Sequence, residues 1–193
     1  MDLSSRILNQ EFKTRMGVQI SDKSLVQRIN DGSVNLVGNE IYYKVVASAV
    51  TSLDDSTVFK TSSSSGVYNT TYATNIDKGI TNPGIWSFCY GIRLLSGINA
   101  TLSSTDFGEA ALDVRWGTIN IQQPNGNILL PLNFPCEKFN TSTKVNNLGV
   151  HYLANRKWLL PETAITVNMR FPVALTANTN LFIGLLVIQN VKQ

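Results

Sequence analysis

Residues 86–94 read WSFCYGIRL, and every second position of this run is large and apolar. The even positions, from Trp86 to Leu94, alternate with the odd positions, from Ser87 to Arg93. A period of two is that of a β-strand, whose successive side chains point to opposite faces. The pattern therefore predicts a strand that carries the aromatic residues of this run on one face.

The same period recurs along the chain from residue 34 onward. Alternating runs occupy residues 41–49, 112–121 and 165–171, and a phase slip at Gly117 suggests a β-bulge in the second of these runs. The tetrapeptide Pro124-Asn125-Gly126-Asn127 separates two apolar-patterned runs and predicts a hairpin. Roughly eight to ten strands result, without a helix of ordinary length. We therefore expect an all-β protein, an antiparallel sandwich or barrel.

Residues 1–33 differ from the rest and predict a short N-terminal helical arm, followed by one β-sandwich domain over residues 34–193. Gly17 can end a first short helix, and Asp31-Gly32 can end a second one. Apolar residues at helical spacing mark the two helices. They are Leu3, Ile7, Leu8 and Phe12 in the first and Leu25, Val26 and Ile29 in the second.

The composition excludes several classes of protein. Hydrophobic residues make up 43% of the chain, but charged residues only 15%, with a net charge of +3. About a quarter is usual for charged residues, so a charge-laced helical bundle is excluded. The charge is too small and scattered for a polyanionic partner, and we expect no direct contact with nucleic acid. We also expect neither a signal peptide nor a transmembrane segment, since no apolar run approaches the about 20 residues that span a bilayer.

The inventory of reactive residues is sparse. The single histidine, His151, has no carboxylate or nucleophile close in sequence, which favours a structural role. Cys89 and Cys136 form no CxxC pair and are expected to be buried thiols, with a disulfide as the alternative. The carboxylates show no paired spacing. We therefore predict no catalytic, cofactor-binding or metal-binding residues and no enzymatic activity, and a glycan-cleaving enzyme ranks last among our hypotheses.

The aromatic residues allow a binding function. Tryptophans and tyrosines on a β-sandwich can form a platform on which sugars stack. Trp86 and Trp116 lie in alternating apolar runs, so we place them in the core. Trp158 follows Arg156-Lys157, and we expect it near the surface, at a contact between subunits.

Residues 181–188 read LFIGLLVI and are apolar on both faces of the predicted last strand. A strand covered on one side only would alternate. The second face therefore needs cover by a second sheet, by the arm or by a neighbouring subunit, because a bare apolar strand promotes aggregation. We expect identical copies to shelter this strand and the arm. The candidate subunit-interface residues are Leu3, Ile7, Phe12, Trp158, Phe182, Leu186 and Ile188.

One family resemblance joins these features. A helical arm leads into a weakly charged β-domain rich in Asn, Ser and Thr, and the stretch WLLPETAITVNMRF at residues 158–171 leads to the apolar closing strand. Together they resemble viral jelly-roll virion proteins, such as those of icosahedral bacteriophages. The likeness is architectural and carries over no functional residues. The residues themselves leave open a jelly roll and an immunoglobulin-like sandwich.

The resemblance implies a jelly-roll-like antiparallel β-sandwich and a structural, self-assembling function. The protein would be a capsid protein or a minor capsid or vertex component, located in the virion and assembled in the host cytoplasm. Its partners would be copies of itself or other virion proteins. The membrane surface is an alternative contact for the amphipathic arm. The alternative function is that of a carbohydrate-binding or receptor-binding β-sandwich, as in a fibre or adhesin.

Overall fold

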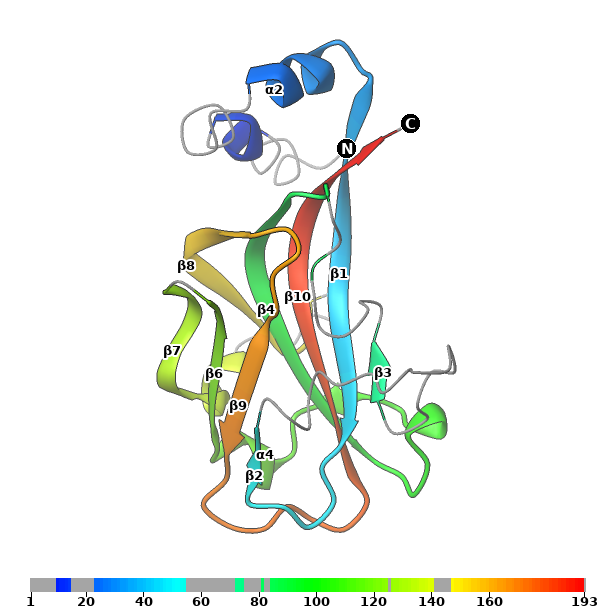
Figure 1. Cartoon of the computed structure of the whole chain (residues 1–193). Helices are drawn as coiled ribbons and strands as arrows, with labels where there is room; N and C mark the ends of the chain where they lie inside the picture. The colour runs from blue at the N-terminus through cyan, green and yellow to red at the C-terminus, as the bar shows by residue number, and fades with distance from the viewer. Residues whose placement is uncertain are drawn as a thin grey trace.

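Two antiparallel β-sheets, packed face to face, form the body of the protein (Figure 1). The computed structural model describes residues 10–14, 23–54, 72–74, 81, 84–124, 126–140 and 147–192. Within these residues it has ten strands, six in one sheet and four in the other. The predicted all-β sandwich is confirmed.

The first sheet is built on four long strands that lie side by side, with a short strand added on each side. The long strands, in spatial order, are β1 (Val34–Val46), β10 (Thr179–Lys192), β4 (Ser87–Ile98) and β8 (Val150–Leu159), and the short strands are β3 (Tyr72–Thr74) on β1 and β5 (Gly108–Glu109) on β4. The second sheet has the order β2 (Ser52–Leu53), β9 (Thr166–Arg170), β6 (Thr118–Gln123) and β7 (Asn127–Pro135).

The pairing of the strands identifies the topology. Without the short β3 and β5, eight strands remain, and the first pairs with the last, the second with the seventh, the third with the sixth and the fourth with the fifth. This is the pattern of one long antiparallel hairpin that is wrapped around a core. The wrapping also joins β10 to β4 and β9 to β6. The result is a jelly roll of two Greek keys, one of the two sandwiches that the sequence left open.

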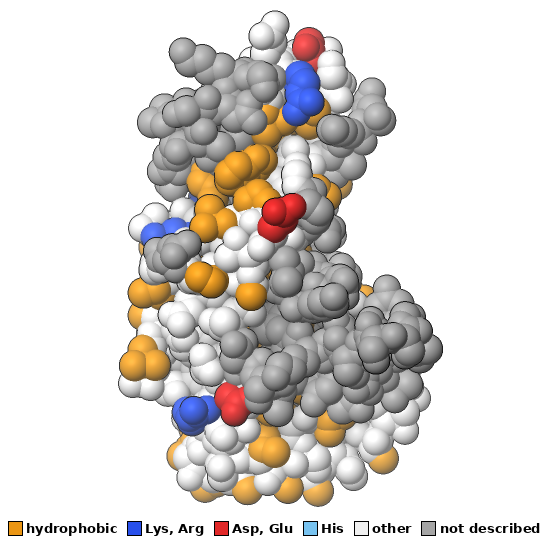
Figure 2. All heavy atoms as spheres, in the orientation of Figure 1, with side chains coloured by type: hydrophobic (Ala, Val, Ile, Leu, Met, Phe, Trp, Pro, Cys, Tyr) orange, Lys and Arg blue, Asp and Glu red, His pale blue; other side chains and the backbone are white. Residues whose placement is uncertain are grey.

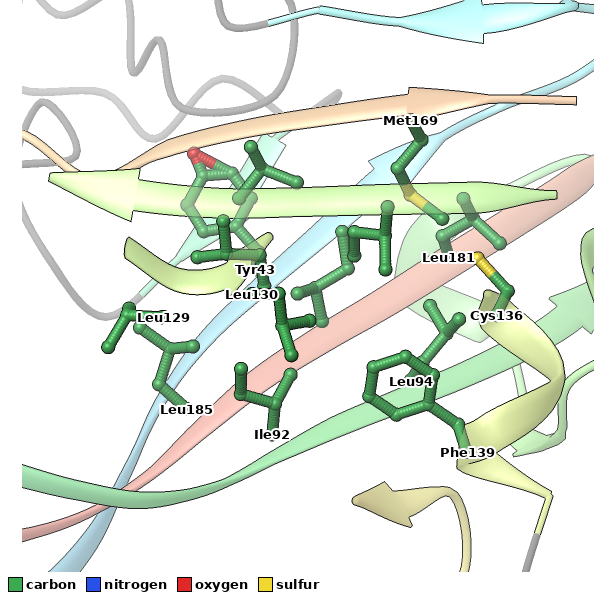
Figure 3. Packing of buried hydrophobic residues seen from close by; sticks show 14 of the residues in the cluster. Tyr43, Ile92, Leu94, Leu129, Leu130, Cys136, Phe139, Met169, Leu181 and Leu185 are labelled. Atoms are coloured by element: carbon green, nitrogen blue, oxygen red, sulfur yellow. The ribbon is translucent and has the colours of Figure 1, made fainter. Parts of the chain in front are cut away.

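The core lies between the sheets, where alternate residues of facing strands interdigitate (Figure 3). Ile92 and Leu94 of β4 and Leu185 of β10 meet Leu130 of β7 and Met169 of β9. The predicted run at residues 165–171 is confirmed, since its odd positions are all buried. The hairpin predicted at residues 124–127 also forms, because β6 ends at Gln123 and β7 begins at Asn127.

The two cysteines are unpaired thiols inside this core, as predicted. Burial raises the pKa of the Cys89 thiol to about 12, against a hydrogen bond to the carbonyl of Gly91, and burial alone raises the pKa of Cys136 to about 12. Both thiols are therefore uncharged and unreactive in the folded protein.

The run WSFCYGIRL forms β4, but its side chains do not keep to one face. In the pairing with β10, Gly91 lies opposite Leu186 and Cys89 opposite Val187, so Tyr90 is an extra residue on β4. The bulge reverses the phase of the strand. As a result Phe88 packs outside the sheet, whereas Ile92 and Leu94 point into the core. The prediction of a single aromatic face is wrong for this reason.

Within the described residues, three short helices follow the first strand, and one of them corrects a predicted strand. They are η3 (Leu102–Ser104), α4 (Leu112–Arg115) and η4 (Cys136–Phe139). The alternation of Leu112, Val114 and Trp116 predicts a strand, but the residues form α4 and its C-cap, an arrangement that buries Val114 and exposes the other two. Residues four apart share one face of a helix, which accounts for that exposure.

The arm is helical in its described parts, at residues 10–14 and in α2 (Lys23–Asn30), in agreement with the sequence. Leu3 and Ile7 lie outside the described residues. Among the described residues, no helix has both the length and the apolar character needed to cross a membrane.

Candidate interaction surfaces

The arm packs on the outer face of the first sheet, near one end of the sandwich (Figure 1). Figure 2 shows hydrophobic side chains gathered at this junction. We call the group the arm cluster. It consists of Phe12, Leu25, Ile29, Val34, Phe88, Trp158 and Ile188, with the half-buried Leu36, Trp86 and Tyr90 around it.

Aromatic rings form the centre of the arm cluster. The Phe12 side chain has no exposed surface, and its ring centroid lies 4.7 Å from that of Trp158 and 6.3 Å from that of Phe88, both edge-on. Trp86 meets Trp158 edge-on at 6.1 Å. An ion pair between Glu11 and Arg156 adds a polar contact beside the rings. Edge-on aromatic pairs contribute about 0.5–1.5 kcal/mol each beyond the area they bury, so this contact is specific as well as apolar.

A three-residue turn, which we call the hinge (residues 31–33), connects the arm to β1. The backbone N–H of Asp31 donates to the carbonyl of Gln27 at 2.9 Å. The Asp31 carboxylate accepts hydrogen bonds from the hydroxyl and backbone N–H of Ser33, at 2.6 and 2.9 Å, and these bonds lower its pKa. Gly32 has a φ of +83°, which favours glycine. Among the described residues, these bonds close within residues 27–33 and link the hinge to itself and to α2.

The five predicted interface residues that the structure describes are mostly covered by the chain itself. Phe12, Trp158 and Ile188 are buried together in the arm cluster. Leu186 is buried, and Phe182 is half-buried, stacked on Tyr42 at 5.6 Å and tilted against Phe107 at 5.7 Å.

The sequence analysis named three structures that could cover the apolar last strand, β10. Two of them, the second sheet and the arm, are supplied within the chain. The inner residues of β10, such as Ile183, pack in the core, and Ile188 packs under the arm. The reasoning that this strand needs a neighbouring copy does not hold. A contact of neighbours with these residues stays a prediction.

The tryptophans are distributed differently from the prediction. Trp158, expected near the surface, is only 8% exposed, whereas Trp116, expected in the core, is 60% exposed. In the pairing of β8 with β4, residues 153–156 of β8 lie opposite the single bulged residue of β4. Trp158 then faces the arm, and the four-residue α4 turns Trp116 outward.

The end of the sandwich away from the arm carries a second surface. Leu112, the first residue of α4, and Trp116, which directly follows α4, are 52% and 60% exposed, and Val173 in the β9–β10 loop is 49% exposed. We call these three residues the loop-end patch. The β9–β10 loop that holds Val173 lies against α4. Gly117, just after α4, packs so closely on Phe171, at the start of the loop, that a Cβ added to Gly117 would stand 2.6 Å from the Phe171 ring. Figure 2 shows hydrophobic side chains along this lower rim.

Hydrogen bonds hold the loop-end patch in place. The Asp113 carboxylate of α4 accepts hydrogen bonds from the backbone N–H and the hydroxyl of Thr176, at 2.9 and 2.8 Å. Burial alone would raise the pKa of Asp113, but these bonds and the one from the Val114 N–H outweigh it and hold the pKa below its ordinary value. Arg115 pairs with Glu109 at 3.3 Å beside the patch. The exposed side chains therefore stand on a fixed backbone.

The edge strand of the second sheet is poorly suited to pairing with another strand. β7 contains Pro131 and Pro135, which donate no hydrogen bond, and Asn133 in a left-handed conformation with a φ of +59°. The register of β7 against β6 also shifts at this point. Prolines and bulges protect an edge strand from pairing with other chains. Association of copies is therefore better served by side-chain surfaces than by this edge.

The single histidine has aromatic neighbours. His151 is half-buried, with its ring 4.9 Å from that of Phe134 and 6.0 Å from that of Phe139. Burial, and to a lesser extent the charge of Lys138, lower its pKa. In the described part of the chain, His, Cys, Asp and Glu do not gather in groups of three that could hold a metal ion. No protein-family model and no curated protein sequence matches the chain.

Proposed function

We propose that this protein is a structural virion component, a capsid protein or a minor capsid or vertex protein, that assembles with copies of itself or with other virion proteins. The observation that carries the proposal is the pair of large apolar side chains, Leu112 at the start of α4 and Trp116 directly after its end, that stand exposed. Exposed apolar groups in a fixed arrangement are typical of protein–protein interfaces.

The character of the loop-end patch suits such a contact. Tryptophan is among the residues that contribute most to binding energy at interfaces. Because Asp113 fastens α4 to the neighbouring loop, little conformational entropy is lost when a partner covers Trp116. The low content of charged residues in the chain, 15%, also fits, since charged residues are depleted in the cores of interfaces.

The jelly roll supports the proposal as a matter of architecture. The fold recurs in viral shell proteins, but also in lectins and cupins, and a fold by itself does not determine a function. The virion assignment therefore depends on whether the purified chain builds regular particles or rings.

The test compares the full-length wild type with two variants by light scattering and electron microscopy. The first variant combines Leu112→Ser with Trp116→Ser. The control is Leu132→Ser, which removes a side chain that is 76% exposed on β7 and does not belong to the loop-end patch. Burying such side chains fully yields about 1.5–3 kcal/mol each, so the double variant should weaken each contact at least about 10-fold.

We expect regular assemblies from the wild type and the Leu132 control, and mainly monomers from the double variant. A wild type that stays monomeric at high concentration would contradict the proposal. If the double variant assembles at the same protein concentration as the wild type, the loop-end patch is not the contact.

The alternative is a carbohydrate-binding or receptor-binding domain of a fibre or adhesin. The observation in its favour is the exposed indole of Trp116 beside the Arg115–Glu109 ion pair, since an indole can stack on a sugar while charged groups bind its hydroxyls. Its signature is a monomer that binds to a glycan array and loses binding when Trp116→Ala is introduced.

A further inference from the structure

We infer that His151 keeps one side of the sandwich closed at neutral pH and releases it in acid, when the imidazole gains a proton. The inference concerns the side on which β7 and β8, the outermost strands of the two sheets, lie next to each other (Figure 1). We call this contact the seam and define it by Phe134 of β7, Phe139 of η4 and His151 of β8. It is independent of the proposed self-assembly.

Three rings from three different elements close the seam. In the pairing of β8 with β4, His151 lies opposite Ile92, whose side chain is in the core, so the imidazole points between the sheets. Its ring centroid lies 4.9 Å from that of Phe134 and 6.0 Å from that of Phe139, and the two phenylalanine rings are 6.0 Å apart. Phe139 is buried, and Phe134 packs half-buried against the core. The imidazole therefore replaces an apolar side chain in an otherwise apolar contact.

The described residues around the seam compensate a charge on His151 poorly. The strand β7 contains no charged residue, and Arg93 of β4 lies on the opposite face, paired with Glu40 at 3.0 Å. On η4, Lys138 repels a protonated ring, whereas Glu137 is exposed to water, which screens its charge. Attraction of a cation to the phenylalanine rings acts in the other direction. The net result is a lowered pKa of His151, with burial as the main cause and Lys138 as the second.

This imbalance makes the seam sensitive to acid. Because the pKa of His151 is lower in the closed than in the unfolded state, where it is about 6.5, the neutral ring stabilises the closed seam above that pH. As the pH falls, the open seam binds the proton more readily, and the free energy that keeps the seam closed decreases. The opening can stay local, since β7 and β8 are outermost strands and η4 has only 4 residues.

The chain carries its own reporters of this opening. Cys136 is the first residue of η4, the helix that holds Phe139, whereas Cys89 lies in β4 between β10 and β8, and both thiols are buried. The full-length protein is treated with 4,4′-dithiodipyridine, which reacts with thiols in acid as well as at neutral pH. Labelling of each cysteine is followed by peptide mass spectrometry at about pH 7.5 and about pH 5, on either side of the ordinary histidine pKa.

The control variant is His151→Phe, which keeps a ring in the seam but has no group that titrates. A second control, His151→Gln, is uncharged at every pH and serves if the larger ring disturbs the packing. The ratio of the wild-type labelling rate to that of the control cancels the pH dependence of the reagent itself. This ratio is compared between the two pH values for each cysteine.

We expect the ratio for Cys136 to rise at least about threefold in acid, and the ratio for Cys89 to stay constant. A ratio for Cys136 that is the same at both pH values refutes the inference. An equal rise for both cysteines also refutes it, because acid would then unfold the whole sandwich instead of opening the seam. Since labelling reports on the single chain, neither result bears on the loop-end patch or on the proposed function.

Discussion

Replacing Phe12 by alanine should release the arm and leave the sandwich folded. Phe12 is fully buried between the arm and the rings of Trp158 and Phe88. Loss of a buried phenylalanine side chain costs about 3–5 kcal/mol when the cavity persists. Among the described residues, the arm contributes two further apolar side chains to the cluster, Leu25 and Ile29, worth at most about 1.5–3 kcal/mol each. Phe12 is therefore a large share of the docking free energy, and undocking becomes about 100-fold or more easier.

The assay follows the arm and the body separately. Release exposes Trp158 to water, so the tryptophan emission should shift to the red and become open to quenching by iodide. Hydrogen exchange should accelerate in α2 but not in β4 or β10. The control is Gln10→Ala, an exposed position in the same helix, which should change neither signal. If Phe12→Ala instead lowers the unfolding free energy of the whole protein in one transition, the arm is part of the core and the division at residue 33 is wrong.

Three further predictions concern the body. Gly97→Ala should lower the unfolding free energy by about 1–3 kcal/mol in a urea titration, because a Cβ there would overlap the carbonyl of Asp106. Gly38→Ala, with open space around it, should change it by less than about 0.5 kcal/mol. Gln123→Leu should cost about 1–3 kcal/mol in thermal unfolding, since the buried amide accepts a backbone N–H at 2.9 Å that would lose its partner. Asp113→Asn should cost about 1 kcal/mol at neutral pH. The pKa of the Asp113 carboxyl is lower in the folded than in the unfolded state. Its contribution to the free energy of unfolding is therefore present above the unfolded-state pKa and is lost as the pH falls. The unfolding free energies of wild type and variant should converge as the pH falls below about 4.

Much of the body could be predicted from the period of the sequence. The alternation at residues 165–171 is a local property of a strand with one face in the core, and the residues 124–126 between β6 and β7 favour a turn wherever they occur. The pairing of the first strand with the last could not be derived from the residues, since it joins segments about 150 positions apart.

The interaction surfaces were the hardest part to predict. Tyr90 continues the alternation in the sequence, and only its register against β10 shows that it is a bulge. The glycine that follows it within an apolar strand was the one available signal. For α4, three alternating apolar residues fit a strand and one helical turn equally well, and packing of Val114 decided between them. The bulge at Tyr90 changed which aromatic residues of β4 lie under the arm, and α4 reversed the exposure expected for Trp116.

The most direct measurement of the central claim is hydroxyl-radical footprinting of the three tryptophans before and after assembly. The claim is that copies meet at the loop-end patch, so Trp116 should be oxidised rapidly in the monomer and become protected in the assembled protein. Trp158, which is buried under the arm, serves as the internal reference. Equal oxidation of Trp116 in monomer and assembly would contradict the account.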